Sequence, residues 1–261
     1  MIGLFRKKKN APAAGGESGP RGPEQTRLYA IGDIHGRADL LIDMHALIRA
    51  DAAGFEGERR IIYLGDYIDR GLQSKQVVEL LLETQLPGFD TVFLKGNHEQ
   101  AMLDFLDYPE ATAGWLSFGG RETLMSYGIN VTFMPLMKDM KNLAEELAQV
   151  LPDSHREFLE DGLLSYRAGD YYFVHAGIRP GVALEDQHFE DQLWIRDEFI
   201  DSDADHGAVI VHGHTITPEP ELNGNRIGLD TGAFHSGVLS CLVIDGDEQR
   251  LLQTDGEPGG F

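Results

Sequence analysis

The sequence predicts an α/β protein with a parallel sheet that presents polar side chains where its strands end. Three apolar, β-branched runs each stop at a glycine that is followed by a polar residue, at Asp33, Asp66 and Asn97. These residues are about thirty positions apart, which is the spacing that βαβ units require. Because sites of open α/β sheets form where the parallel strands end, we expect the three side chains to lie close together.

The first half of the chain alternates predicted strands with predicted helices. Each helix is indicated by apolar residues at helical spacing, and Ser74 is placed to cap the second helix. The pattern predicts strands at 28–31, 60–64 and 91–94, and helices at 38–50, 74–86 and 97–106.

The second half returns to apolar runs that stop at polar residues capable of binding a metal. Strands are predicted at 171–174, 208–211, 226–229 and 237–244. Asp245-Gly246-Asp247 then indicates a hairpin turn into one more strand. The polar residues that end the first three of these strands are His175, His212, His214 and Asp230.

We divide the chain into a leader, one domain and a short tail. Residues 1–26 carry a basic cluster and are otherwise rich in alanine, glycine and proline, so we expect a disordered leader. Residues 27–255 form the predicted domain, and residues 256–261 a frayed end rich in glycine. The sequence does not decide whether the basic leader has a binding role.

Residues 110–165 differ from the rest and predict a helical insertion in the domain. Helices are expected at 137–151 and 154–161, and a loop-like, aromatic and glycine-rich segment at 115–123. Trp115, Phe118 and Arg121 are candidates for substrate contact, although aromatic packing and a surface charge are the favoured explanation. Whether the insertion is a mobile lid or a fixed wall stays open.

The composition argues against two classes of protein. The net charge is −21, whereas general nucleic-acid binding relies on lysine and arginine that contact phosphates. No apolar run approaches the roughly 20 residues that span a bilayer, and the first residues lack the order of a signal peptide. We therefore expect a cytoplasmic protein with no nucleic-acid partner and no stable membrane association.

The residues at the strand ends are typical ligands of divalent metal ions. Imidazole, carboxylate and amide groups together suit Mn, Fe or Zn, and they do not suit a thiolate-bound structural zinc. The set is too large for one ion, so we expect two ions that share one carboxylate. Asp66 follows the central strand and is the expected bridge. The full set is Asp33, His35, Asp66, Asn97, His98, His175, His212, His214 and Asp230.

A family resemblance is carried by five motifs in order: Gly32-Asp33-Ile34-His35-Gly36, Gly65-Asp66-Tyr67-Ile68-Asp69-Arg70-Gly71, Gly96-Asn97-His98-Glu99, His175-Ala176-Gly177 and Gly213-His214-Thr215. Between about residues 28 and 245 the chain closely resembles the calcineurin-like metallophosphoesterases, in particular the bacterial and phage form of the phosphoprotein phosphatases. The resemblance implies a four-layer αββα sandwich. It also implies a first metal ion at Asp33, His35 and Asp66, and a second at Asp66, Asn97, His175 and His214. Mn²⁺ is the expected metal, with Fe or Zn as alternatives.

The same resemblance assigns the residues that handle phosphate. Arg70 and Arg196 would bind the phosphoryl oxygens together with Asn97, which suits the forked donors of a guanidinium group. His98 would be the general acid and Asp69 would orient it, while a hydroxide held between the metals attacks in line. Glu99 would support the structure. For Arg196 a surface salt bridge with Asp197 or Glu198 is the alternative. His212 is expected to pack or to orient a ligand, and Asp230 to orient a ligand or brace a turn.

The resemblance implies a phosphomonoester hydrolase, and we expect a serine/threonine protein phosphatase that also accepts small phosphoesters. The alternative is a bis(5′-nucleosyl)-tetraphosphatase, whose relatives tend to lack the residue equivalent to Asp69 and to carry Asp in place of Glu99. His175-Ala176-Gly177-Ile178 fits either group. A non-catalytic phosphate-binding module is a third possibility, but the chain lacks none of the expected ligands and retains His98. The physiological substrate, the native metal and the oligomeric state do not follow from the sequence.

Overall fold

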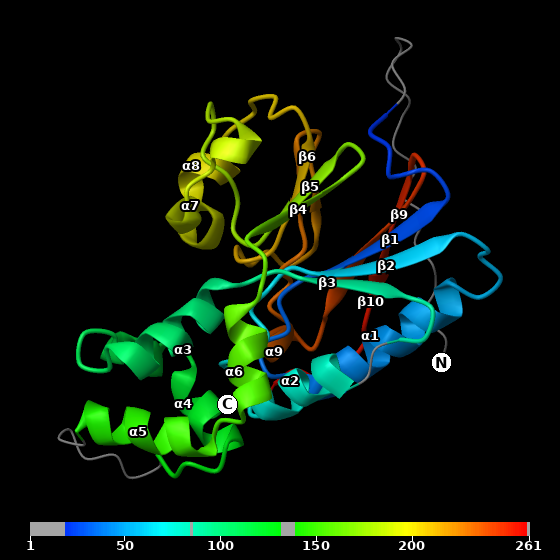
Figure 1. Cartoon of the computed structure of the whole chain (residues 1–261). Coiled ribbons are helices and arrows are strands. Elements are labelled where there is room, and N and C mark those ends of the chain that lie inside the picture. The colour runs from blue at the N-terminus through cyan, green and yellow to red at the C-terminus, as the bar shows by residue number, and fades with distance from the viewer. Residues whose placement is uncertain (1–18, 84–85, 132–138, 260–261) are drawn as a thin grey trace.

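The computed structural model describes residues 19–83, 86–131 and 139–259, and it contains two mixed sheets of five strands each (Figure 1). The first sheet has the order β10-β9-β1-β2-β3, with bounds β1 Thr26–Ile31, β2 Glu58–Tyr63, β3 Asp90–Phe93, β9 Ser240–Asp245 and β10 Glu248–Gln253. The second has the order β4-β5-β6-β8-β7, with bounds β4 Ser165–Ala168, β5 Tyr171–Val174, β6 Val209–His212, β7 Glu221–Leu222 and β8 Arg226–Gly228.

The parallel strands of each sheet end at one edge. β1, β2 and β3 are parallel neighbours, and their last residues Ile31, Tyr63 and Phe93 are in register. In the second sheet, β5, β6 and β8 are likewise parallel. The residues that follow these strands therefore lie side by side, as the alternation of strands and helices predicts.

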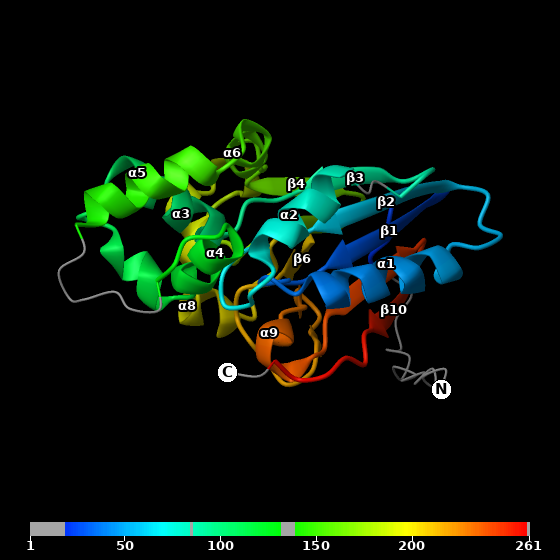
Figure 2. The same cartoon turned by 90° about the horizontal axis from the view of Figure 1, so that it is seen from below.

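Helices and sheets form four layers, which is the predicted αββα sandwich. One apolar core lies between the two sheets and includes Leu28 and Ile62 of the first sheet with Phe173 and Val211 of the second. Figure 2 shows α1 and α2 against the outer face of the first sheet. The neighbouring residue Tyr29 belongs to the core on that face, as strand alternation requires. A third core lies between the outer face of the second sheet and the segment with α7 and α8.

The helix bounds are α1 Ala38–Asp51, α2 Ser74–Glu83, α3 Asn97–Asp107, α4 Gly120–Ser126, α5 Met140–Val150, α6 Asp153–Glu160, α7 Phe189–Trp194, α8 Asp197–Ile200 and α9 Ala233–Ser236, with 3₁₀-helices η1 Ala113–Ser117 and η2 Leu184–Asp186. α1, α3, α5 and α6 lie close to their predicted ranges. The last positions predicted for the second helix (84–85), and the first predicted for 137–151, fall outside the described residues. Within the described part of the chain, no helix has the length and apolar character needed to cross a bilayer.

The segment 115–123 was predicted to be loop-like, and this prediction is wrong. It contains most of η1 and the start of α4, joined at Phe118 and Gly119. Tertiary packing explains the difference, because the Trp115 ring packs against Phe105 and against the backbone of Gly120, where an added Cβ would lie 2.5 Å from the indole. The close approach of the Trp115 ring therefore requires glycine at position 120.

Both predicted ends of the domain extend further than expected. In the leader predicted to run to residue 26, the Gly22 amide donates to the carbonyl of Gly246, and Thr26 already begins β1. At the other end the Gly256 amide donates to the carbonyl of Gly237, and Arg37 donates to the carbonyl of Glu257. These backbone groups find partners that composition does not reveal. The basic cluster of the leader lies outside the described residues.

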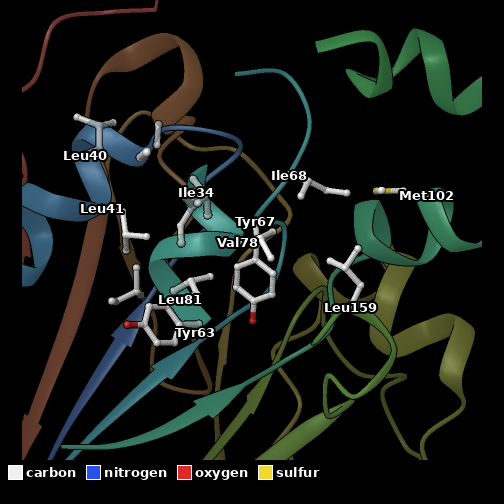
Figure 3. Packing of buried hydrophobic residues seen from close by; sticks show 14 of the residues in the cluster. Ile34, Leu40, Leu41, Tyr63, Tyr67, Ile68, Val78, Leu81, Met102 and Leu159 are labelled. Atoms are coloured by element: carbon white, nitrogen blue, oxygen red, sulfur yellow. The ribbon is translucent and has the colours of Figure 1, made fainter. Parts of the chain in front are cut away.

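The loops that carry the polar residues are fixed by apolar residues between them. Ile34, Tyr67 and Ile68 are at most 2% exposed, and they pack in one core with α2 and α3 (Figure 3). The Tyr67 hydroxyl also donates to the carbonyl of Leu94. Close packing of this kind restricts rearrangement of the neighbouring polar side chains.

Candidate metal centre

Most of the unusual backbone conformations in the described residues occur at the ends of the parallel strands. Six described non-glycine residues have positive φ. Five of them follow parallel strands and are predicted site residues, namely His35, Asp66, Asp69, Arg70 and His214, whereas Gln25 precedes β1. Such conformations are unfavourable for residues with a Cβ and persist only where the surrounding structure holds them. We refer to segments 32–36, 64–71, 94–97, 175–177 and 212–215 as the edge loops.

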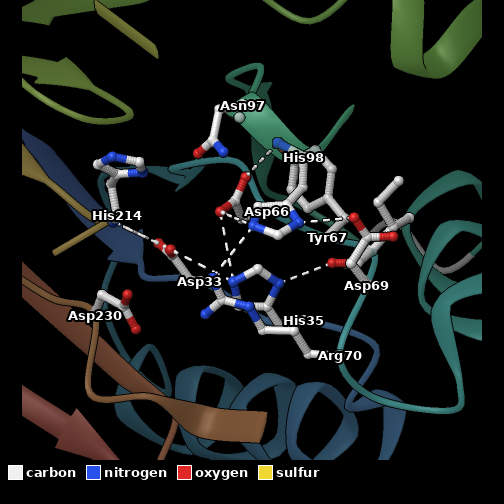
Figure 4. A network of polar contacts seen from close by, with 12 residues as sticks. Asp33, His35, Asp66, Tyr67, Asp69, Arg70, Asn97, His98, His214 and Asp230 are labelled. Atoms are coloured by element: carbon white, nitrogen blue, oxygen red, sulfur yellow. Dashed lines mark hydrogen bonds and ion pairs between the residues drawn. The ribbon is translucent and has the colours of Figure 1, made fainter. Parts of the chain in front are cut away.

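Asp66 lies at the centre of the polar residues that the edge loops bring together (Figure 4). One of its oxygens, Oδ2, is 3.4 Å from Nε2 of His35, and the other, Oδ1, is 3.4 Å from Nε2 of His175. The backbone amide of His98 also donates to Oδ1, at 3.1 Å. The two carboxylate oxygens therefore face histidines on opposite sides, the arrangement expected of a carboxylate shared by two ions.

Two groups of side chains in the described residues have ligand atoms close enough to hold a metal ion. One consists of His35, Asp66 and His98, and the other of Asp66, His175 and His214, so Asp66 belongs to both. Of the other predicted ligands, Asp33 lies 4.0 Å from Nε2 of His35, and Oδ1 of Asn97 is 2.9 Å from Nε2 of His175. All six predicted ligands are therefore in one place, with His98 beside them.

The histidines present nitrogen atoms suited to a metal. Nδ1 of His35 lies 2.8 Å from the carbonyl of Ile68 and Nδ1 of His175 lies 2.8 Å from that of Leu64, which directs Nε2 of each ring toward Asp66. Among the described residues, the buried Nε2 atoms of His35 and His214 have no hydrogen-bond partner. Burial holds the pKa of His35 well below its ordinary value and lowers the pKa of His214 to about 2. Both rings are thus neutral and able to donate a lone pair.

Buried carboxylates around Asp66 add to the fit. Asp33 accepts hydrogen bonds from the backbone amide of His214 at 3.2 and 3.1 Å. Its burial, followed by repulsion from Asp230 and Asp66, raises the pKa of Asp33 well above its ordinary value. Asp230 braces a turn by accepting from the Gly232 amide, while its other oxygen is buried without a partner in the described residues. Divalent ions would relieve this repulsion, so the residues present fit a dinuclear centre.

His98 is held in a defined orientation at the rim of this group. Its Nδ1 donates to Oδ2 of Asp69 at 2.7 Å, and its Nε2 lies 3.3 Å from Nη2 of Arg70. Burial alone would lower the pKa of His98, but Asp66 and Asp69 together raise it above its ordinary value. The predicted pairing of His98 with Asp69, and the predicted position of Arg70 beside it, are both present.

Glu99 supports the central edge loop, segment 64–71, which contains Asp66. Its buried carboxylate accepts hydrogen bonds from the backbone amides of Asp66 and Gly96 through Oε2, and from those of Tyr67 and Ile68 through Oε1. Burial and then the nearby Asp66 raise the pKa of Glu99 to about 7. Its position agrees with the supporting role that was expected.

Asp69 has partners that the motifs do not contain. Trp115 donates its indole N–H to Oδ2 at 2.7 Å, and the Thr123 hydroxyl donates to Oδ1 at 2.6 Å. The Asp69 amide in turn donates to the hydroxyl oxygens of Thr123 and Ser74. Trp115 was considered only for substrate contact or packing, and Thr123 was not considered, because both belong to a region remote from Asp69 in sequence.

Arg196 and His212 lie on the side of the site formed by the second sheet. Arg196 donates to the carbonyl of His214 at 3.2 Å, and Glu198 pairs with Arg179, so the surface salt bridge considered for Arg196 is not formed with this residue. The His212 ring is buried with its edge toward Phe199 at 5.1 Å, which agrees with a packing role. The half-exposed ring of Trp194, which sequence analysis did not identify, lies edge-on to His214 at 6.5 Å.

A cleft of about 560 Å³ opens beside Arg70. It is lined by Arg70, by side chains of the 116–122 segment that include Phe118 and Arg121, and by Phe234. The Arg70 guanidinium lies over the Phe234 ring at 4.8 Å, and Phe118 is 60% exposed. No hydrogen bond or ion pair of Arg121 occurs in the described part of the chain. The cleft therefore combines two cationic groups with two aromatic rings.

Comparison with known proteins places these features in a family. The family model described as calcineurin-like phosphoesterase matches residues 26–235. Among curated proteins, the chain is 24% identical over 240 residues to the asymmetrical bis(5′-nucleosyl)-tetraphosphatase PrpE of Bacillus mycoides, a match that covers 81% of this chain and 88% of the relative.

Solved structures show the same fold at low sequence identity. One is a protein provisionally assigned as a diadenosine tetraphosphatase, with a TM-score of 0.59, 21% identity and coverage of 91% of this chain and 96% of the other. Another is a protein serine/threonine phosphatase from Saccharomyces cerevisiae, with a TM-score of 0.57, 14% identity and coverage of 90% and 82%. At these identities the likeness concerns the fold alone.

Proposed function

Since the chain belongs to the calcineurin-like phosphoesterase family, whose members are metal-dependent hydrolases, we propose that it removes phosphate from phosphoserine or phosphothreonine in proteins. The observation that carries this proposal is the position of His98, held by Asp69 on one side and lying 3.3 Å from Arg70 on the other. A proton donor beside a guanidinium suits a terminal phosphate whose leaving group is a poor alkoxide.

We propose that two divalent ions bind at the residues brought together around Asp66. Asp33, His35 and Asp66 would hold one ion, and Asp66, Asn97, His175 and His214 the other. When bound, the ions would activate the water that attacks phosphorus and would neutralise charge on the phosphoryl group. Mn²⁺, Fe and Zn all suit this mixture of imidazole, carboxylate and amide ligands.

The remaining roles belong to side chains at the rim. Arg70 and Arg196 bind the phosphoryl oxygens, because a guanidinium can donate two parallel hydrogen bonds to them. Asn97 contributes its amide to the same group. His98 gives its Nε2 proton to the leaving oxygen, and Asp69 keeps the opposite ring nitrogen protonated and the ring in position. No covalent enzyme intermediate is required.

The cleft beside Arg70 favours a second candidate substrate. A dinucleoside tetraphosphate has further phosphates beyond the one cleaved, and it has flat bases. Arg121 and the exposed ring of Phe118 offer complementary chemistry for both. The printed name of the Bacillus mycoides relative points to the same substrate class. Against this candidate stands the net charge of −21, which disfavours a highly anionic substrate.

A direct rate comparison separates the two candidates. Chelator-treated protein is supplied with Mn²⁺, and kcat/KM is measured for a phosphothreonine peptide and for diadenosine tetraphosphate. An advantage of about tenfold or more for the peptide supports the protein-phosphatase proposal. An advantage for the dinucleotide overturns it and supports the second candidate.

A further inference from the structure

Both carboxylate oxygens of Asp69 accept hydrogen bonds from other residues. Oδ2 accepts from His98 Nδ1 and from the Trp115 indole, both at 2.7 Å, and Oδ1 accepts from the Thr123 hydroxyl at 2.6 Å. Asp69 is fully buried. A carboxylate held by three donors in a dry environment cannot rotate without breaking bonds that no water replaces.

Two of these three donors come from a part of the chain remote from the edge loops, whereas His98 directly follows the edge loop 94–97. Trp115 belongs to η1 and Thr123 to α4, and the chain between them also contacts the central edge loop, because the Arg70 amide donates to the carbonyl of Gly119. Gly119 lies so close that an added Cβ would be 2.3 Å from the Arg70 nitrogen. The same segment therefore fixes the side chain of Asp69 and the backbone of Arg70.

We propose that Trp115 and Thr123 are positioning residues for proton transfer by His98, acting through Asp69. The proposal rests on the function proposed above. In the step concerned, water adds its oxygen to phosphorus and releases one proton to solvent, while the bond from phosphorus to the leaving oxygen breaks. The Nε2 proton of His98 moves to that oxygen, giving an alcohol and inorganic phosphate, and His98 then regains a proton from solvent. If Asp69 shifts, the His98 ring shifts with it, and this proton no longer points at the leaving oxygen.

Misplacement of His98 and a general loss of stability are expected to affect two kinds of substrate differently. An alkoxide leaves poorly and needs the proton, whereas p-nitrophenolate is a stable anion and leaves with little help. Misplacement of His98 should therefore slow hydrolysis of a phosphothreonine peptide far more than hydrolysis of p-nitrophenyl phosphate. A protein that is partly unfolded or poor in metal would lose both activities in the same proportion.

Two substitutions remove the donors with small changes in shape. Trp115→Phe removes the indole N–H and keeps an aromatic ring against Phe105, and Thr123→Val removes the hydroxyl at nearly constant volume. Thr123→Ser restores the hydroxyl and is the conservative rescue. Phe105→Leu is the matched packing control, because Phe105 contacts the Trp115 ring at 5.1 Å and makes no hydrogen bond to Asp69. Metal content and the thermal midpoint are measured for each variant.

We expect Trp115→Phe and Thr123→Val to lower kcat/KM for the phosphothreonine peptide by about 10- to 100-fold and that for p-nitrophenyl phosphate by less than about threefold. Thr123→Ser and Phe105→Leu should change the ratio of the two values by less than about threefold. If Trp115→Phe does not fold, the comparison of Thr123→Val with Thr123→Ser tests the proposal. An equal loss on both substrates in the Thr123→Val variant overturns the inference while leaving the proposed function intact. A wild-type protein inactive on both substrates overturns both.

Discussion

The edge loops and the helical region, which comprises η1, α4, α5 and α6, contribute to the site in different ways. The edge loops place ligand atoms, and they do so through their backbone, since His35, Asp66 and His214 have left-handed conformations. The helical region supplies Trp115 and Thr123, whose side chains donate hydrogen bonds to Asp69, a residue that is not a predicted metal ligand. Metal binding and orientation of the proton donor are thus carried by different parts of the chain, and they can be disrupted separately.

The largest effect is expected from Asp66→Asn in the edge loops. Asp66 is the residue common to both groups of ligands, and an amide has one oxygen with which to replace the two oxygens of a carboxylate. We expect both ions to be lost together, and activity with them, with elemental analysis falling from about two ions per chain to fewer than one. A variant that retains two ions shows that Asp66 is not the bridge.

His98→Asn tests the boundary between the two regions. His98 lies in a group of possible metal ligands but is oriented by Asp69, so its substitution decides between the two roles. Turnover of a phosphothreonine peptide should fall by roughly 10² to 10⁴, the usual contribution of general acid catalysis, while metal content stays nearly unchanged. Loss of metal would assign His98 to the metal centre and contradict its role as the proton donor.

Arg121→Gln tests whether the helical region also selects the substrate. If diadenosine tetraphosphate binds in the cleft, we expect its kcat/KM to fall by about tenfold, because a charge-assisted hydrogen bond is lost, while p-nitrophenyl phosphate is unaffected. Arg121→Lys should recover part of the loss. Arg49→Gln, at the exposed end of α1, is the control for the change of net charge. Equal behaviour of the Arg49 and Arg121 variants would show that the cleft does not bind the dinucleotide.

A smaller effect is expected from His155, which lies in α6 of the helical region and faces α2. Its Nδ1 lies 2.8 Å from the Tyr127 hydroxyl, and it faces Glu79, Lys75 and Glu83. Burial lowers the pKa of His155 from its ordinary value of 6.5, although the two glutamates oppose the shift. The unfolded chain therefore binds the proton more readily, so stability is complete above pH 6.5 and falls as the pH drops below it.

The free energy of unfolding of the wild type should thus fall more between pH 7 and pH 5 than that of His155→Gln does. Urea unfolding at the two pH values measures this difference. His188→Gln, at an exposed histidine, is the control and should keep the dependence of the wild type. If His155→Gln also keeps it, protonation of His155 does not contribute to acid destabilisation.

The two regions also differ in how far the sequence predicts them. The edge loops follow β-branched strands and contain glycine, carboxylate and imidazole in short local patterns, so Asp33, Asp66 and Asn97 could be placed together from strand spacing alone. Trp115 and Thr123 reach Asp69 across about fifty residues of chain, and nothing local marks an indole N–H as the partner of a distant carboxylate. Phe234 and Trp194, beside the site, were missed for the same reason.

The secondary structure shows the same difference between features with a local sequence signal and features without one. Strands and helices with clear periodicity lie close to their predicted ranges, as α1 and α3 show. The short helices α7, α8 and α9 were not anticipated, because a helix of four to six residues has no measurable periodicity. The start of α4 was also missed, because Gly119 and Gly120 suggest a loop until the Trp115 ring is in place.

The measurement that tests this account most directly is the turnover of p-nitrophenyl phosphate by the chelator-treated full-length protein during titration with Mn²⁺. The account predicts no activity without metal and recovery that is complete at about two equivalents per chain, with no recovery in Asp66→Asn. Activity that survives chelation, or that saturates at one equivalent, would contradict a dinuclear centre built around Asp66.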